Sequence, residues 1–172
     1  MKKFFAIVCM MLMSTTAMFA QNEAMALGVK VNYGISSDWK PFGIGAKFQY
    51  EFVENVRAEA AVNYYFPKDN NSVLDGNVNL QYLFRINDKM AFYPTAGLSL
   101  INMMITGDYK DILKAAGQDT SKFLVGFNGG VGFEYFLTNN IKADIEVKYQ
   151  YAKSDGWKID WEPISIGFSY VF

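Results

Sequence analysis

Histidine is absent from this 172-residue sequence, and its single cysteine, Cys9, lies close to the N-terminus. These two residue types supply the usual general base, the usual thiol nucleophile and most ligands of transition metals. We therefore expect neither an enzyme nor a metal or cofactor site. Basic runs are missing as well, so nucleic acid is not an expected partner.

Long apolar runs are also scarce. The apolar run from Phe4 to Met13 follows two lysines and precedes small and polar residues up to Ala20. This order is that of a secretory signal peptide, and the run is too short for a spanning helix, which needs roughly 20 apolar residues. We predict a signal peptide over residues 1–20 and one exported domain over residues 21–172, which would hold no cysteine and no disulfide.

The hydrophobic residues, 51% of the chain, are dispersed as alternation. In residues 141–151, IKADIEVKYQY, every odd position is apolar and every even position is charged or an amide. Such a strand has one apolar and one polar face. The same pattern recurs in segments of about ten residues, at 24–33, 42–52, 56–66, 77–86, 90–100, 123–135 and 164–172. We predict an all-β fold, an eight-stranded antiparallel up-and-down barrel, because closure of this kind requires an even number of strands.

The links between these segments alternate in length. Three of them, 53–55, 87–89 and 138–140, are short and rich in turn-forming residues, whereas the others are longer and polar. Short turns at one end and long loops at the other are typical of transmembrane barrels. Within the fifth segment Pro94 cannot donate a ladder hydrogen bond, so we expect a bulge or a missing bond there.

Alternation does not say which face points inward. A lipocalin-like barrel, apolar within and polar without, is the competing interpretation. Two observations favour a transmembrane barrel. Along the apolar faces the aromatic residues gather at the strand ends and the aliphatic ones in the middle, as in a bilayer with two interfaces. The polar faces are rich in glycine, which makes room for large side chains inside a narrow barrel.

The final stretch, ISIGFSYVF, resembles the terminal strand of outer-membrane barrels, and the whole exported chain resembles the small eight-stranded OmpA, OmpX and opacity-protein type. The resemblance implies an outer-membrane location with both termini periplasmic, and a monomer. It implies contact with outer-membrane lipid and lipopolysaccharide, and a terminal aromatic signal, here Tyr170 and Phe172, for the barrel-assembly machinery. The implied role is structural or surface interaction; the porin-family label offers a narrow diffusion channel as the alternative.

The predicted inner face carries nearly balanced charges. Because unpaired charges are costly in a narrow lumen, we expect an ion-pair network that plugs the barrel, with Glu51 opposite Arg57. A selectivity lining in a water-filled lumen is the alternative interpretation. The expected network consists of Lys30, Lys47, Arg57, Arg85, Lys142 and Lys148 with Glu51, Glu59, Glu134, Asp144 and Glu146.

The three tryptophans, Trp39, Trp157 and Trp161, all fall in predicted loops. We expect a hairpin that turns near residues 155–156 and protrudes past the membrane, with a bulge before Pro163 where the alternation changes parity. The rings either extend the outer aromatic belt or contact another protein or a surface glycolipid.

Overall fold

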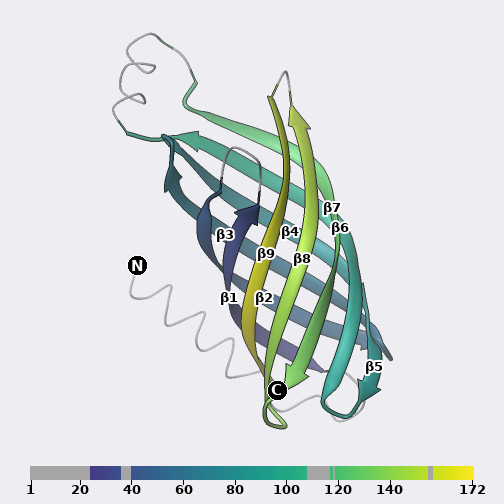
Figure 1. Ribbon diagram of the computed structural model, residues 1–172. Helices are drawn as coiled ribbons and strands as arrows, with labels where there is room; N and C mark the ends of the chain where they lie inside the picture. The colour runs from purple at the N-terminus through teal and green to yellow at the C-terminus, as the bar shows by residue number, and fades with distance from the viewer. Residues whose placement is uncertain (1–23, 36–39, 108–116, 118, 155–156) are drawn as a thin grey trace, which may run out of the picture.

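The computed structural model describes residues 24–35, 40–107, 117, 119–154 and 157–172 (Figure 1). The predicted signal peptide lies outside them and stays a prediction. Over the described residues the regular structure is β-strand, and no helix there is long and apolar enough to cross a membrane. The strands are β1 (Met25–Ile35), β2 (Phe42–Val53), β3 (Val56–Lys68), β4 (Asn71–Tyr82), β5 (Phe84–Asn87), β6 (Met90–Ile105), β7 (Ser121–Phe136), β8 (Ile141–Ser154) and β9 (Trp157–Val171).

The strands form a closed barrel in which every neighbouring pair is antiparallel. Around the wall the order is β4-β3-β2-β1-β9-β8-β7-β6-β5, and β4 also pairs with β6, which closes the sheet. Since β4 and β5 are consecutive pieces of one wall strand along β6, the barrel has eight strands. The predicted eight-stranded up-and-down fold is confirmed.

The break between β4 and β5 lies opposite Pro94. The ladder to β6 stops at the pair Gln81 and Thr95 and resumes, in the same register, at Phe84 and Phe92. Between them the Leu83 N–H donates to the Asn55 carbonyl at 2.7 Å. Proline lacks the N–H that a continuous ladder needs. The irregularity expected at Pro94 is therefore an interruption of the ladder without a bulge.

Two of the links predicted to be long are tight hairpins. β3 and β4 are joined by Asp69 and Asn70 alone, with φ of 51° and 61°, the left-handed values that a type I′ turn requires. Between β8 and β9, Ser154 pairs directly with Trp157, as the predicted turn near residues 155–156 requires. Polar segments that we expected as loops thus continue the wall as strands, because ladder hydrogen bonds hold the backbone whatever the side-chain pattern.

The bulge predicted before Pro163 is wrong. β9 keeps one register with β1 from Ala26 and Val171 to Ile35 and Glu162. The apparent change of parity has another cause: Trp161 points inward, as Pro163 does. The inner face is apolar at this level, so no extra residue is needed to turn the side chains around.

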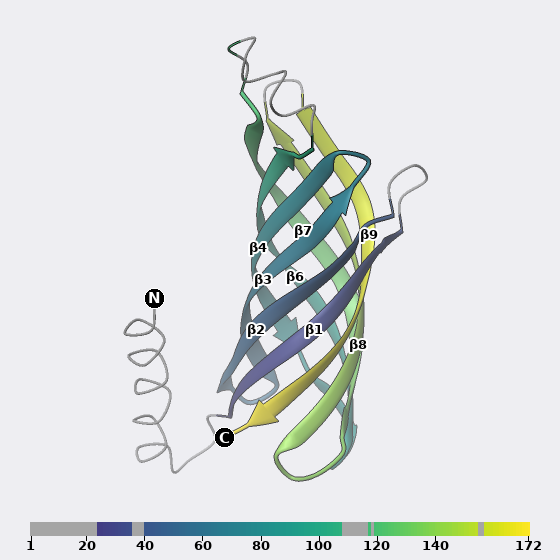
Figure 2. The ribbon, with the colours of Figure 1, turned by 90° about the vertical axis from the view of Figure 1, so that its left-hand side faces the viewer.

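The barrel has two different ends, called here the turn end and the hairpin end. The turn end carries the short links β2–β3, β5–β6 and β7–β8 together with the start of β1 and the end of β9 (Figure 2). There the Phe172 N–H donates to the Met25 carbonyl at 2.9 Å. The hairpin end carries the β3–β4, β6–β7 and β8–β9 links, and strands that are inclined to the barrel axis connect the two ends.

Candidate functional site

The two faces of β8 decide the orientation of the whole sheet. On this strand the side chains of Ile145 and Val147 are 47% and 40% exposed, whereas Asp144 and Glu146 are 5% and 3% exposed. The apolar face is therefore outside and the charged face inside. The lipocalin-like alternative, with a polar outer surface, is excluded.

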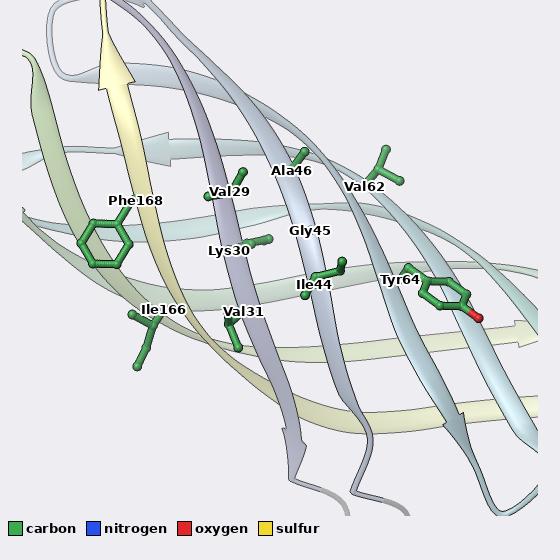
Figure 3. Close-up of a pocket in the computed structure, with 10 residues that line it drawn as sticks. All are labelled: Val29, Lys30, Val31, Ile44, Gly45, Ala46, Val62, Tyr64, Ile166 and Phe168. Carbon is green, nitrogen blue, oxygen red and sulfur yellow. The ribbon is translucent and has the colours of Figure 1, made fainter. Parts of the chain in front are cut away.

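The outer surface is an apolar band. Its most exposed members include Val29, Val78 and Leu98, and rings stack near the ends, as Phe42 does on Phe66 with centroids 5.9 Å apart. Around the small residues Gly45 and Ala46 the band has a shallow groove of about 770 Å³ (Figure 3). The groove is lined by Val29, Lys30, Val31, Ile44, Gly45, Ala46, Val62, Tyr64, Ile166 and Phe168.

Inside, near the turn end, Glu134 joins two cations. Its Oε2 lies 2.7 Å from Arg57 Nη1 and 3.0 Å from Lys142 Nζ, and the three side chains are 2–4% exposed. Arg57 also donates from Nε to Gln81 Oε1 at 2.7 Å, and its guanidinium lies 5.0 Å from the centre of the Tyr93 ring. Arg57 is thus held by three strands besides its own.

Glu51 lies opposite Arg57 in the β2–β3 register, as predicted, but the two do not form the expected ion pair. Glu51 Oε1 is 2.5 Å from Arg85 Nη2 instead. The two residues pair elsewhere because Arg57 reaches across the lumen to Glu134. There its guanidinium is buried and is bound by both Glu134 and Gln81. Arg85 is on the rim, with a side chain 47% exposed, and is the cation that remains for Glu51.

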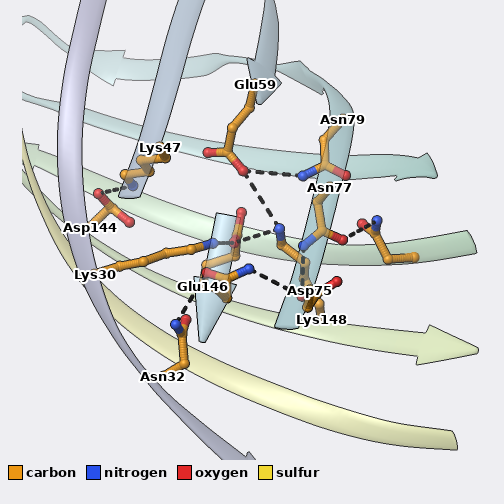
Figure 4. A network of polar contacts seen from close by, with 12 residues as sticks. Lys30, Asn32, Lys47, Glu59, Asp75, Asn77, Asn79, Asp144, Glu146 and Lys148 are labelled. Atoms are coloured by element: carbon orange, nitrogen blue, oxygen red, sulfur yellow. Dashed lines mark hydrogen bonds and ion pairs between the residues drawn. The ribbon is translucent and has the colours of Figure 1, made fainter. Parts of the chain in front are cut away.

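A second charged group occupies the middle of the lumen (Figure 4). Lys47 Nζ is 2.5 Å from Asp144 Oδ1, while Lys148 Nζ lies 3.0 Å from Glu146 Oε1 and 3.6 Å from Glu59 Oε1. Lys30 Nζ approaches Glu146 Oε1 at 3.8 Å. Charges of opposite sign therefore alternate across the lumen, and each lysine has a carboxylate within 4 Å.

Toward the hairpin end the ion pairs give way to amides around a carboxylate that the sequence analysis missed. Asp75, 1% exposed, accepts hydrogen bonds from Asn63 Nδ2 (3.1 Å), Asn77 Nδ2 (2.8 Å) and Gln150 Nε2 (3.0 Å). Asn77 Oδ1 in turn accepts from Asn128 Nδ2 at 3.1 Å. We expected the strand to begin at residue 77, so Asp75 fell outside the predicted wall. The available signal was parity: Val73 and Asp75 occupy the same alternate positions as the inward-facing Asn77.

The side chain of Trp161 lies inside the barrel and not on its surface. Trp161, which we expected either in the outer aromatic belt or as a loop contact, is 1% exposed and packs inside the barrel against Tyr65, with ring centroids 4.6 Å apart. It points inward because β9 keeps its register, as described above. Trp39 lies outside the described residues, and Trp157 is placed by its backbone at the start of β9.

The two residues predicted as an assembly signal lie on the outside of the turn end. Tyr170 is 54% exposed and Phe172 is 36% exposed, and their rings are 6.4 Å apart. Both rings thus face the surroundings of the barrel. Over the described residues no group of three or more histidine, cysteine or acidic side chains is placed to hold a metal ion.

A closed barrel with an apolar band outside, aromatic rings toward its ends and charges within is a transmembrane β-barrel, since closure of the sheet leaves no open strand edge in the lipid. The chain belongs to the family described as "Outer membrane protein beta-barrel domain", which matches residues 5–172. It is therefore an outer-membrane protein. In barrels of this membrane the short turns face the periplasm.

Known proteins agree with this assignment. Residues of this chain are 44% identical over 55 positions to the 25 kDa outer-membrane immunogenic protein of Brucella ovis, a match that spans 31% of this chain and 25% of the relative. The N-terminal barrel domain of Pseudomonas aeruginosa OprF has a TM-score of 0.69 at 17% identity, covering 88% of this chain and 98% of that one. Neisserial surface protein A (NspA) has a TM-score of 0.65 at 17% identity, with the same coverage. At these identities the two structures show the fold alone.

Proposed function

We propose that this protein is a structural barrel of the outer membrane whose lumen is plugged by paired charges and whose hairpins present a binding surface outside the cell. The carrying observation is the burial of the inner charges: Lys47, Arg57, Glu134 and Lys142 are 2–3% exposed, and Lys148 is 5% exposed. The lining of a water-filled pore would be accessible to a water-sized molecule. Barrels of eight strands have room for little besides their side chains.

Planar-bilayer recording of the refolded protein tests the plug. We expect no steady current, and the same result for a Lys148→Glu variant. A steady current proportional to salt concentration, with a selectivity that Lys148→Glu reverses, would contradict the proposal.

That result would establish the alternative, a narrow diffusion channel for small solutes. One observation favours it: several buried polar atoms have no hydrogen-bond partner within the described part of the chain, among them Gln49 Oε1, Asn79 Oδ1 and Thr95 Oγ1. Buried polar groups are usually satisfied, often by water. Waters bound in a row at such atoms could line a pore. The two groups of buried ion pairs nevertheless favour the plug.

We propose further that the protein is not an enzyme. The lumen carboxylates that would serve as acid or base are held by lysine, arginine or amide donors, as Glu134 and Asp75 show. They are also closed off from a substrate in the membrane by the sheet itself. Incubation of the refolded barrel with phospholipid and lipopolysaccharide, followed by mass spectrometry, should show no turnover.

The surface of the hairpin end is the proposed site for a partner, either another protein or a surface glycolipid. The β8–β9 hairpin continues beyond the outward ring of Tyr151 and bears an exposed ion pair, Lys158 Nζ to Asp160 Oδ2 at 3.0 Å. Trp157 begins β9 at its tip. Binding of lipopolysaccharide to the nanodisc-embedded barrel, compared between wild type and a Trp157→Ala variant, tests the glycolipid; loss of binding in the variant is expected. Equal binding would exclude Trp157 as a contact.

A further inference from the structure

Near the hairpin end the lumen holds a cluster of apolar side chains. Seven buried residues, 0–6% exposed, form one cluster contributed by β3, β4, β6, β7, β8 and β9. We call this cluster the apolar septum. Its members are Tyr65, Val73, Ile101, Leu124, Ala152, Ile159 and Trp161.

Two rings close the part of the lumen that faces β1 and β2. Tyr65 on β3 and Trp161 on β9 are in contact although β1 and β2 separate their strands in the wall. They reach each other over glycine: a Cβ added at Gly34 would lie 2.9 Å from Trp161 Cε3, and one at Gly43 would lie 2.8 Å from Tyr65 Cδ1. The rings therefore fill the space that a side chain on either strand would take.

Below the septum the lumen is polar and has unmet hydrogen-bonding capacity. Asn128 Oδ1 and Gln150 Oε1, in the amide layer directly beneath, are buried without a partner among the described residues. Sites of this kind hold water. An apolar layer excludes water, and constrictions of this chemistry stop ions by dewetting. The other apolar cluster, Leu83, Ala91 and Tyr93, comes from adjacent wall strands and does not cross the lumen.

We propose that the apolar septum is the barrier between the cell surface and the lumen, with Trp161 as its central residue, and that the buried ion pairs below it hold the barrel wall together. The inference rests on the proposed function, a closed barrel, and adds an apolar closure on the hairpin-end side of the ion pairs. It gives Trp161 the role of a seal in place of the surface contact that the sequence suggested.

Single-cysteine labelling tests the septum, because the exported chain predicted here has no cysteine of its own. Ser99 lies on the inner face of β6 directly below Ile101 and is fully buried. In nanodiscs, a Ser99→Cys variant should react very slowly with the small cationic thiol reagent methanethiosulfonate ethylammonium. Adding Trp161→Ser should raise the rate by about tenfold or more, since thiol reactivity depends on access. Serine is used because a purely apolar void stays dry.

Three controls make the result specific. Trp161→Phe keeps a ring and should leave Ser99→Cys slow. Tyr151→Ser removes an outward ring one position from Trp161 across the β8–β9 pair and should also have no effect. A Ser169→Cys reporter, 3% exposed at the turn end, should not respond to Trp161→Ser unless the barrel has loosened as a whole. Heat-dependent gel mobility checks that each variant is folded, and Tyr65→Ser replaces Trp161→Ser should that variant not fold.

The outcomes separate this inference from the proposed function. If folded Trp161→Ser and Tyr65→Ser leave Ser99→Cys slow, or if Ser99→Cys is already fast with the septum intact, the septum is not the barrier. Steady current through the wild-type protein would instead overturn the closed barrel itself. A fast Ser99→Cys without wild-type current overturns only the septum.

Discussion

Replacement of Glu134 by glutamine should lower the free energy of unfolding by about 3–5 kcal/mol, the usual cost of breaking a buried ion pair. Glu134 Oε2 is the shared anion of Arg57 and Lys142, at 2.7 and 3.0 Å. Glutamine has the same shape, so packing is unchanged and the loss is electrostatic. It leaves two cations, 3–4% exposed, without their carboxylate.

The upper part of this range is expected because the remaining partners of Arg57 do not carry charge. Gln81 Oε1 accepts one hydrogen bond, and the Tyr93 ring offers a cation–π contact. Among the described residues, Lys142 keeps its contact with the Phe136 ring, 5.8 Å from Nζ. Urea titration of the protein in lipid vesicles, with the folded fraction read from gel mobility, measures the change.

Two comparisons make the test discriminating. Asp160→Asn breaks the exposed pair with Lys158, whose side chains are 39% and 56% exposed, and should change stability little. Adding Lys142→Met to Glu134→Gln removes one orphaned cation and should recover part of the loss. If Glu134→Gln costs no more than Asp160→Asn, the lumen charges are solvated and the reasoning fails.

Other predictions follow from the same structure. Ile145→Arg on the outer face should destabilise the barrel by about 2–4 kcal/mol in lipid, as refolding titrations would show, and a smaller effect would place this face in water. Gly132→Ala puts a Cβ 2.3 Å from the Tyr93 ring and should cost about 1–3 kcal/mol by urea titration, relieved by Tyr93→Ala. Asn70→Val at φ 61° should cost about 1–2 kcal/mol, and Asn70→Gly should not. Phe172→Ser should reduce the folded fraction in cells, measured by heat-dependent gel mobility, while the purified variant still refolds.

The alternation of residues was sufficient to predict the fold because it is a direct consequence of strand geometry. In 141–151 the polar set is inside without exception, and the same parity places Lys47 and Glu59 in the lumen. The positions of the aromatic residues and of the glycines then predicted which face points to lipid and which to the lumen. Gly132, whose missing side chain admits Tyr93, is an instance of the room that the sequence analysis expected.

Individual ion pairs were not predictable from register alone. Glu51 and Arg57 are cross-strand neighbours, yet each pairs elsewhere, because long side chains in a narrow lumen reach partners on distant strands. Glu134 is 77 residues from Arg57 in sequence. The partner depends on lumen width and strand tilt, which no local pattern specifies.

The hairpin end was the least predictable region, since its inner face changes from polar to apolar. Trp161 and Ile159 belong to an inner face, but beside the outward Ile164 and Ile166 they read as a shift of parity. Asp75 was missed because the predicted strand began at residue 77, although the apolar Val73 and the acidic Asp75 belong to the same inner face. Both errors come from assuming a single hydrophobic rule along the full length of each strand.

The seam between β1 and β9 pairs residues 26–35 with residues 162–171, almost the full length of the chain apart. Until the last of these residues has left the ribosome, any sheet formed by the preceding strands has two open edges, which lipid cannot solvate. Insertion must therefore follow complete synthesis, and the polypeptide has to cross the periplasm before its barrel closes. Loss of either terminal segment would consequently abolish the entire structure and not one hairpin of it.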